Sequence, residues 1–64
     1  MSPSPIRVLV VDDHAIVRRG LADLIGTADD LAVAGTAASG EEAIAMAADL
    51  GPDVVLMDLS MPGL

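Results

Sequence analysis

Cysteine, the aromatic residues and lysine are all missing from this chain of 64 residues. Without cysteine there is no disulfide and no thiolate, so cofactor sites that need sulfur ligands are excluded. The three basic residues are all arginines and face ten acidic ones, which gives a formal net charge of -7. This balance disfavours contact with a phosphate backbone, so we expect no direct nucleic-acid binding by the segment.

Long apolar runs are missing as well. Every apolar stretch is far shorter than the roughly 18 residues that a membrane span requires, so no contact with a membrane is expected. The first five residues alternate serine and proline after Met1 and lack the basic start of a signal peptide. We therefore expect a cytoplasmic chain with a disordered tail over residues 1–5.

The apolar residues that are present change their spacing along the chain. Ile6 to Val11 form a continuous run with β-branched residues, which is typical of a strand buried on both faces. From Ala15 the spacing becomes helical, and Gly26 is a plausible end for this amphipathic helix. Its expected buried face consists of Val17, Leu21, Leu24 and Ala28.

Two further strands and one helix are predicted in the second half. Residues 31–37 favour a strand whose small side chains and glycine suit the edge of a sheet. Ser39 and Glu42 form a capping box, in which the serine accepts from the Glu42 amide and the Glu42 carboxylate reaches back to Ser39. The helix that follows is expected to end near Leu50, because Gly51 favours a left-handed cap. Residues 54–58 then predict the third strand.

This order of elements predicts an α/β fold. Strands that alternate with helices through short connections imply right-handed crossovers and a parallel sheet. We expect three strands in the order 2-1-3, with one helix on each face of the sheet.

Three acids stand at the expected carboxyl ends of two strands. Asp12 and Asp13 follow the first strand, and Asp58 ends the third. Ligand sites of open parallel sheets form at this edge, where the strand order reverses. Carboxylates that crowd there repel one another unless a cation neutralises them, and Mg²⁺ prefers oxygen ligands. The sequence therefore predicts a magnesium site, with one carboxylate left to act as a nucleophile.

Three motifs carry a family resemblance that spans nearly every residue from Ile6 onward. V-V-D-D-H at 10–14, R-R-G-L at 18–21 and V-V-L-M-D-L-S-M-P-G at 54–63 resemble the receiver domain of bacterial two-component response regulators. The residues of the first two motifs are similar to those of the NarL/FixJ subgroup. The resemblance implies a flavodoxin-like (CheY-like) fold, and residues 6–64 would form its amino-terminal part.

The resemblance also implies roles for individual residues. Asp58 would be the phosphoacceptor that takes a phosphoryl group from a sensor histidine kinase. Asp13 would bind Mg²⁺ directly, Asp12 would act mainly through a metal-bound water, and the backbone carbonyl of Ser60 would be another metal ligand. Members of the subgroup usually regulate transcription through a separate output domain.

By this resemblance, a complete receiver domain has five repeats of a strand and a helix. The 64 residues contain two and a half of them. The threonine or serine, the lysine and the aromatic residue of the family's switch have no counterpart among them. We therefore expect weak Mg²⁺ binding and poor phosphorylation of this chain on its own. The third strand would be left as an unpaired edge, which predicts a homo-oligomer formed through it.

Two other functions fit parts of the sequence. A Mg²⁺-dependent phosphohydrolase also has a nucleophilic aspartate after a strand. Enzymes of that class carry a D-x-D motif after the first strand, whereas Asp12 and Asp13 are adjacent here, so we expect no enzyme. A self-associating assembly module with idle aspartates is the other alternative. His14 is expected to be solvated or to cap the first helix, while Arg18 and Arg19 suit an acidic partner and a solvated helix face equally well.

Overall fold

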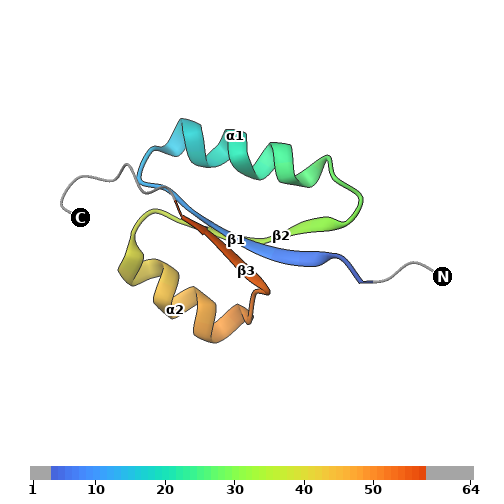
Figure 1. Ribbon diagram of the computed structural model, residues 1–64. Coiled ribbons are helices and arrows are strands. Elements are labelled where there is room, and N and C mark those ends of the chain that lie inside the picture. The colour runs from blue at the N-terminus through green and yellow to red at the C-terminus, as the bar shows by residue number, and fades with distance from the viewer. Residues whose placement is uncertain (1–3, 58–64) are drawn as a thin grey trace.

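A parallel sheet of three strands forms the middle of the structure, a computed structural model that describes residues 4–57. The elements in chain order are β1 (Ile6–Val11), α1 (Ala15–Gly26), β2 (Leu31–Ala37), α2 (Gly40–Leu50) and β3 (Val54–Met57). The strands lie in the order β2-β1-β3, and the two helices cover opposite faces of the sheet (Figure 1). The predicted α/β fold and strand order are confirmed.

Two expectations about the ends of the chain are not decided here. The expected tail over residues 1–5 falls partly outside the described residues and stays a prediction. The third strand ends at Met57, the last described residue, so its predicted extension to Asp58 also stays open. Neither helix within residues 4–57 has the length and hydrophobicity that a membrane span needs.

The strand β1 lies between the other two and supplies most of the core. Leu9, Val10 and Val11 are fully buried, as the continuous apolar run predicts for a strand covered on both faces. Because successive side chains point to opposite faces, β1 contributes to two separate clusters. The cluster under α2 contains Leu9, Val11, Ala37 and Ala43, with Met46 and Ala47 packed against it. The cluster under α1 contains Val8, Val10 and Ile25, with Leu21 and Leu31 packed against it.

The buried face of α1 differs from the predicted one. Leu24 is 68% exposed and Val17 is 46% exposed, whereas Ile25 is the helix residue that is buried. The residues of α1 that are turned inward are Arg18, Leu21, Ala22 and Ile25. These positions also follow the helical spacing of three and four residues, so the prediction was wrong by about one residue of helix rotation. Arg18 is therefore the first residue of the inward-facing side of α1.

The ends of α2 follow the sequence signals with one correction. Ser39 Oγ accepts a hydrogen bond from the Glu42 amide at 3.2 Å, as the capping box predicts. Glu42 does not reach back to Ser39: its Oε2 accepts from the amide of Ala38 at 3.3 Å instead. At the other end Gly51 has φ 59° and ψ 52°, the expected left-handed cap, and its amide donates to the carbonyl of Ala47.

The strand β2 contains an irregularity that the sequence pattern does not reveal. Val8 pairs with Val33 but Leu9 pairs with Gly35, so one extra residue is accommodated in β2. A Cβ at Gly35 would come within 2.7 Å of Met46 Cε and 2.9 Å of Leu50 Cδ1. The glycine thus lets α2 pack closely on this edge strand. Close packing therefore explains a glycine at this position, in addition to the edge position expected from the sequence.

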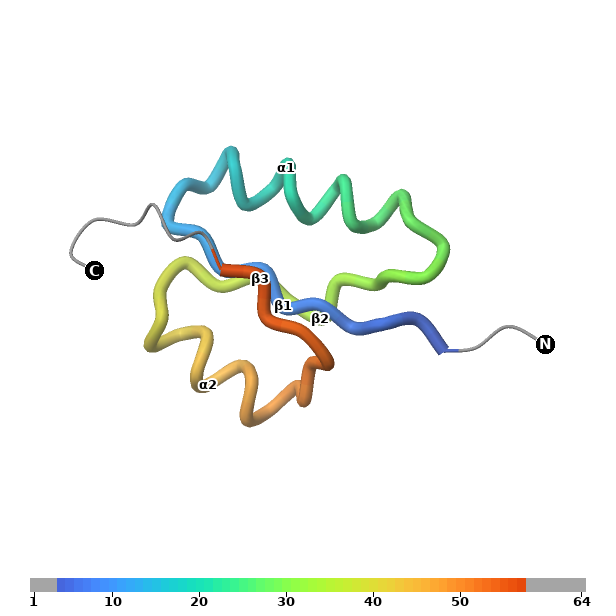
Figure 2. Tube along the Cα trace, viewed as in Figure 1, coloured from blue at the N-terminus to red at the C-terminus, as the bar shows by residue number. Residues whose placement is uncertain are grey.

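Arg7 joins the start of β1 to the end of α2 and the start of β3. Its Nη1 donates to the carbonyls of Leu50 at 2.7 Å and Gly51 at 3.2 Å, where a positive charge also suits the carboxyl end of the helix dipole. Its amide donates to Asp53 Oδ2 at 2.9 Å, and the Asp53 amide donates to the Arg7 carbonyl at 2.9 Å. Beyond this point β1 and β3 run side by side in the same direction (Figure 2).

Candidate functional site

Asp12 is buried directly after the last residue of β1. Its side chain has no exposure, although it carries an ionisable carboxylate. The Asp12 amide donates to the carbonyl of Ala37 on β2 at 3.1 Å, which holds the backbone against the sheet. Oδ1 accepts from the His14 amide at 2.8 Å, while Oδ2 has no hydrogen-bond partner among the described residues. A buried oxygen of this kind is costly unless a cation or a donor reaches it.

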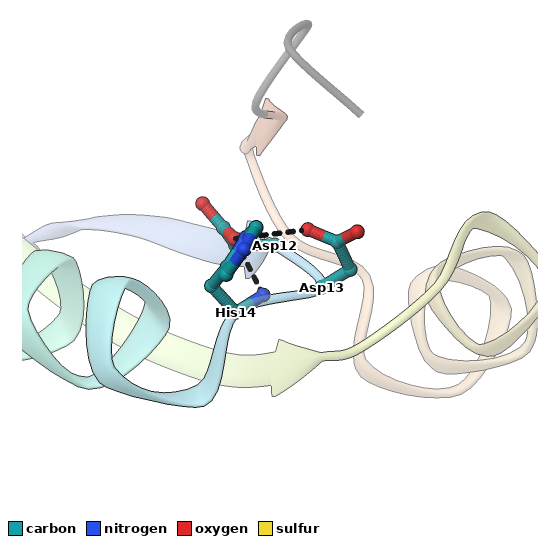
Figure 3. Close-up of side chains that lie close together, drawn as sticks. All are labelled: Asp12, Asp13 and His14. Atoms are coloured by element: carbon teal, nitrogen blue, oxygen red, sulfur yellow. Dashed lines mark hydrogen bonds and ion pairs between the residues drawn. The ribbon is translucent and has the colours of Figure 1, made fainter. Parts of the chain in front are cut away.

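Asp13 and His14 complete a cluster around this carboxylate (Figure 3). His14 Nδ1 lies 3.0 Å from Asp13 Oδ1 and 3.8 Å from Asp12 Oδ1. One potential ligand atom from each of the three residues lies within 4.8 Å of the others. The Asp13 side chain is 39% exposed and that of His14 is 72% exposed, so water reaches both side chains.

His14 is solvated, as expected, because its side chain is 72% exposed, and it also contacts Asp13. It occupies the N-cap position of α1, but its side chain makes no capping hydrogen bond. The cap is supplied from two residues upstream by Asp12 Oδ1, which accepts from the His14 amide in the manner of an Asx turn. The imidazole is therefore free to lie beside Asp13, a contact between sequence neighbours that the sequence analysis did not predict.

Arg18 reaches back from the second turn of α1 to the same segment. Its Nη1 donates to the backbone carbonyl of Asp12 at 2.8 Å, and the contact is partly buried. Arg19, the next residue, is exposed. The two adjacent arginines, which look equivalent in the sequence, thus lie in different surroundings.

The remaining predicted site residues, Asp58 and Ser60, lie outside the described residues. The described register nevertheless bears on them, because Val11 pairs with Met57 in the parallel ladder. Val11 directly precedes Asp12 in the sequence, and Met57 directly precedes Asp58. The assignment of Asp58 and Ser60 to the site stays a prediction.

The cluster has the chemistry of a site for a hard cation. Two carboxylates at one strand end supply the oxygen ligands that Mg²⁺ prefers, and the unpartnered Asp12 Oδ2 is an acceptor without a protein donor. The buried, unpartnered oxygen is an observation that does not depend on the sequence motif, and it too indicates that these acids suit a magnesium ion. A hollow lined by Ala45, Met46, Ala48 and Asp49 lies on α2 and includes none of the cluster residues.

The chain is similar to a known protein family and to several of its members. The family described as response regulator receiver domain matches residues 8–64. The chain is 56% identical over 59 residues to the response regulator GacA of Pseudomonas viridiflava, covering 92% of this chain and 28% of that protein. It is 45% identical over 60 residues to the nitrate/nitrite response regulator protein NarL of Escherichia coli K12, covering 94% of this chain and 28% of that protein.

A solved structure has a similar fold and sequence. A crystal structure of the P1 domain of CheA3 in complex with CheY6 from R. sphaeroides contains a chain that matches with a TM-score of 0.83 and 39% identity, covering 97% of this chain and 49% of that chain. The present chain thus spans less than a third of the curated relatives and about half of the matching structure.

Proposed function

Because the chain belongs to the response regulator receiver domain family of two-component signalling, we propose that it carries the phosphoacceptor site of such a domain. Asp58 is the proposed nucleophile, and Asp12, Asp13, Asp58 and the Ser60 carbonyl are the proposed ligands of Mg²⁺. The observation that carries the proposal is the buried Asp12 carboxylate, whose Oδ2 lacks a partner among the described residues. Such an oxygen suits a bound cation or its water shell.

The proposed chemistry needs little from the protein besides position and charge. A carboxylate oxygen of Asp58 attacks the phosphorus of a phosphohistidine, the P–N bond breaks, and its electron pair returns to the imidazole. The product is an acyl phosphate on Asp58. When bound, Mg²⁺ would neutralise the charge of the phosphoryl and carboxylate oxygens. The chain would accept this group without being an enzyme that acts on a separate substrate.

The proposed partner is a sensor histidine kinase in the cytoplasm. The matching structure, whose title names CheY6 in complex with the P1 domain of CheA3, supports a partner of this class. The outer face of α1 supports it too, because Ile16 lies two residues after His14 and is 88% exposed. The relatives GacA and NarL are response regulators, which supports a role in transcription regulation through an output domain.

Acetyl phosphate with Mg²⁺ tests the assignment of Asp58. We expect a minor fraction of the chain to gain the mass of one phosphoryl group, and none of the Asp58→Asn variant. The fraction is expected to be small because these residues contain no lysine to contact the phosphoryl oxygens. Intact-mass spectrometry measures it, with the exposed Asp49→Asn variant on α2 as the control. Equal labelling of Asp58→Asn would contradict the assignment, and near-complete labelling of the parent chain would contradict the expected defect.

A phosphate-release assay with a generic phosphate ester separates the phosphohydrolase alternative. A phosphohydrolase would release inorganic phosphate from such an ester over many turnovers, whereas the proposed phosphoacceptor would release none from it. The assembly alternative is separated by Mg²⁺ titration, since idle aspartates predict an oligomer that binds no magnesium.

We also propose that two copies of the chain pair through the outer edge of β3. This strand contacts β1 on one side, and no other described strand covers its second side. Its four residues are all apolar and are each between 40% and 48% exposed. Strand edges of this kind, without a charge or a proline to block pairing, tend to add another strand. A two-fold arrangement would satisfy the outward backbone groups of both copies.

A lysine at the edge tests this pairing. Leu56→Lys is expected to weaken the dimer by at least about tenfold, because two like charges near the two-fold axis would repel and lose their hydration. Sedimentation velocity across micromolar concentrations measures the dissociation. Ile16→Lys introduces the same charge on α1 and is expected to leave the dimer intact. A parent chain that remains monomeric at high micromolar concentration would refute the pairing.

A further inference from the structure

Arg18 occupies an unusual place for a charged residue. It stands at the start of the inward stripe of α1, one turn before Leu21 and Ala22, and is partly buried. An arginine turned toward a sheet is costly unless its guanidinium finds an acceptor. Arg18 finds one in the Asp12 carbonyl, where Nη1 donates at 2.8 Å.

This contact fixes the backbone of Asp12 from a second side. The Asp12 amide is already bonded to the Ala37 carbonyl of β2. With the carbonyl held by Arg18, both peptide groups that flank the Asp12 Cα are tied down, one to the sheet and one to the helix. These two bonds fix the direction in which the Asp12 side chain leaves the backbone, and the His14 amide, which donates to Oδ1, orients the carboxylate whose Oδ2 is unpartnered.

We propose that Arg18 is a positioning residue that holds the Asp12–Asp13 segment in the conformation that binds the cation. The inference rests on the proposed function, because it deals with how the same site is prepared for Mg²⁺. It assigns Arg18 no direct contact with the ion. It also separates Arg18 from Arg19, whose guanidinium is exposed.

The sign of the effect distinguishes positioning from charge. A positive group near the site repels Mg²⁺, so removal of an arginine that acts only through its charge would tighten metal binding. Loss of a hydrogen bond that orients a ligand weakens binding instead, by about tenfold for typical second-layer contacts of metal sites. Arg18→Ala and Arg19→Ala remove the same charge from adjacent positions of one helix, and only the first removes the bond to Asp12.

Magnesium titrations of the full chain, followed by NMR amide shifts, test the proposal. The shifts report the folded population, so a loss of stability alone does not change the dissociation constant. We expect Arg18→Ala to raise that constant by about tenfold, Arg19→Ala to leave it unchanged or lower it, and Arg18→Lys to recover part of the loss. Equal constants for the two alanine variants would overturn the proposal.

Amide hydrogen exchange in metal-free buffer provides the second measurement. The Asp12 and His14 amides are expected to exchange faster in Arg18→Ala than in Arg19→Ala, because both depend on the conformation of Asp12. Unchanged exchange would overturn the proposal. If the parent chain binds no Mg²⁺, the metal part of the proposed function fails, and the exchange rates alone decide whether Arg18 holds the segment.

Discussion

Asp12→Asn is expected to stabilise the metal-free protein while abolishing its response to magnesium. In the parent chain a fully buried carboxylate has one oxygen bonded to the His14 amide and the other unpartnered among the described residues. Asparagine keeps the carbonyl acceptor for His14 and replaces a buried charge with a neutral amide. An unpaired buried amide costs less than an unpaired buried charge, so a gain of about 1 kcal/mol is reasonable.

Thermal unfolding followed by circular dichroism measures both effects. A change of about 1 kcal/mol shifts the midpoint of a domain of this size by about 4–8 °C. Added Mg²⁺ should raise the midpoint of the parent chain, because a ligand that binds only the folded state stabilises it, and should leave the variant unchanged.

A matched control is available on α1 for the Asp12 experiment. Asp23 is exposed, so Asp23→Asn removes the same charge outside the cluster and should change neither the midpoint nor the magnesium response. A variant at Asp12 that unfolds at lower temperature without metal, or that keeps the full response to Mg²⁺, would contradict the interpretation of Asp12 as a metal-linked acid.

Leu9→Ala is expected to remove about half of the stability of the fold. Leu9 is fully buried on the middle strand and belongs to the cluster under α2. Truncation of a buried leucine costs about 2–5 kcal/mol, since the lost transfer free energy is joined by the cavity left behind. A domain of this length has a total stability of roughly 3–10 kcal/mol, at the usual 0.05–0.15 kcal/mol per residue.

Urea unfolding followed by far-ultraviolet circular dichroism suits this experiment, since the chain has no aromatic residue for fluorescence. Leu24→Ala is the matched control, because it makes the same truncation at a helix position that is 68% exposed. We expect the control to change stability by less than about 0.5 kcal/mol. A large loss at Leu24 would instead support the helix face predicted from the sequence.

The sheet could be predicted well because its signals agree with one another. The run Ile6–Val11 is apolar at every position except Arg7, which is the pattern of a strand covered on both faces. Ser39 and Gly51 mark the ends of α2 with residues that have a specific backbone role there. Once the strands and helices alternate, the handedness of crossovers leaves few arrangements open.

The rotation of α1 could not be predicted from periodicity. Apolar residues occur nearly all round this helix, so a stripe through Val17 and Leu24 and a stripe through Ile25 both fit the spacing, and both contain Leu21. The charge of Arg18 argued against the second stripe. Its long aliphatic stem and the Asp12 carbonyl make that place favourable, and neither effect is part of a hydropathy pattern.

The assignment of Asp12, Asp13, Asp58 and Ser60 to one site stays a prediction, and the contacts of the described residues were not predicted. Asp12 and Asp13 lie together because they are adjacent in the sequence after β1, whereas the side-by-side ends of parallel strands predict only the approach of Asp58, which lies outside the described residues. Which carboxylate oxygen lacks a partner depends on side-chain torsions and on the turn before His14. Such details are decided by local geometry that no single residue type specifies.

The Arg7 contacts also show how far apart in the sequence the joined elements lie. They join residues that are 43 to 46 positions apart in a chain of 64, and the middle strand is the first element to be synthesised. Its second neighbour, β3, is the last of the described elements. Closing so long a loop costs chain entropy before any contact is gained, which slows the folding of parallel sheets. During synthesis β1 can pair with β2 first, and its side facing β3 stays unpaired until residues 53 to 57 have left the ribosome.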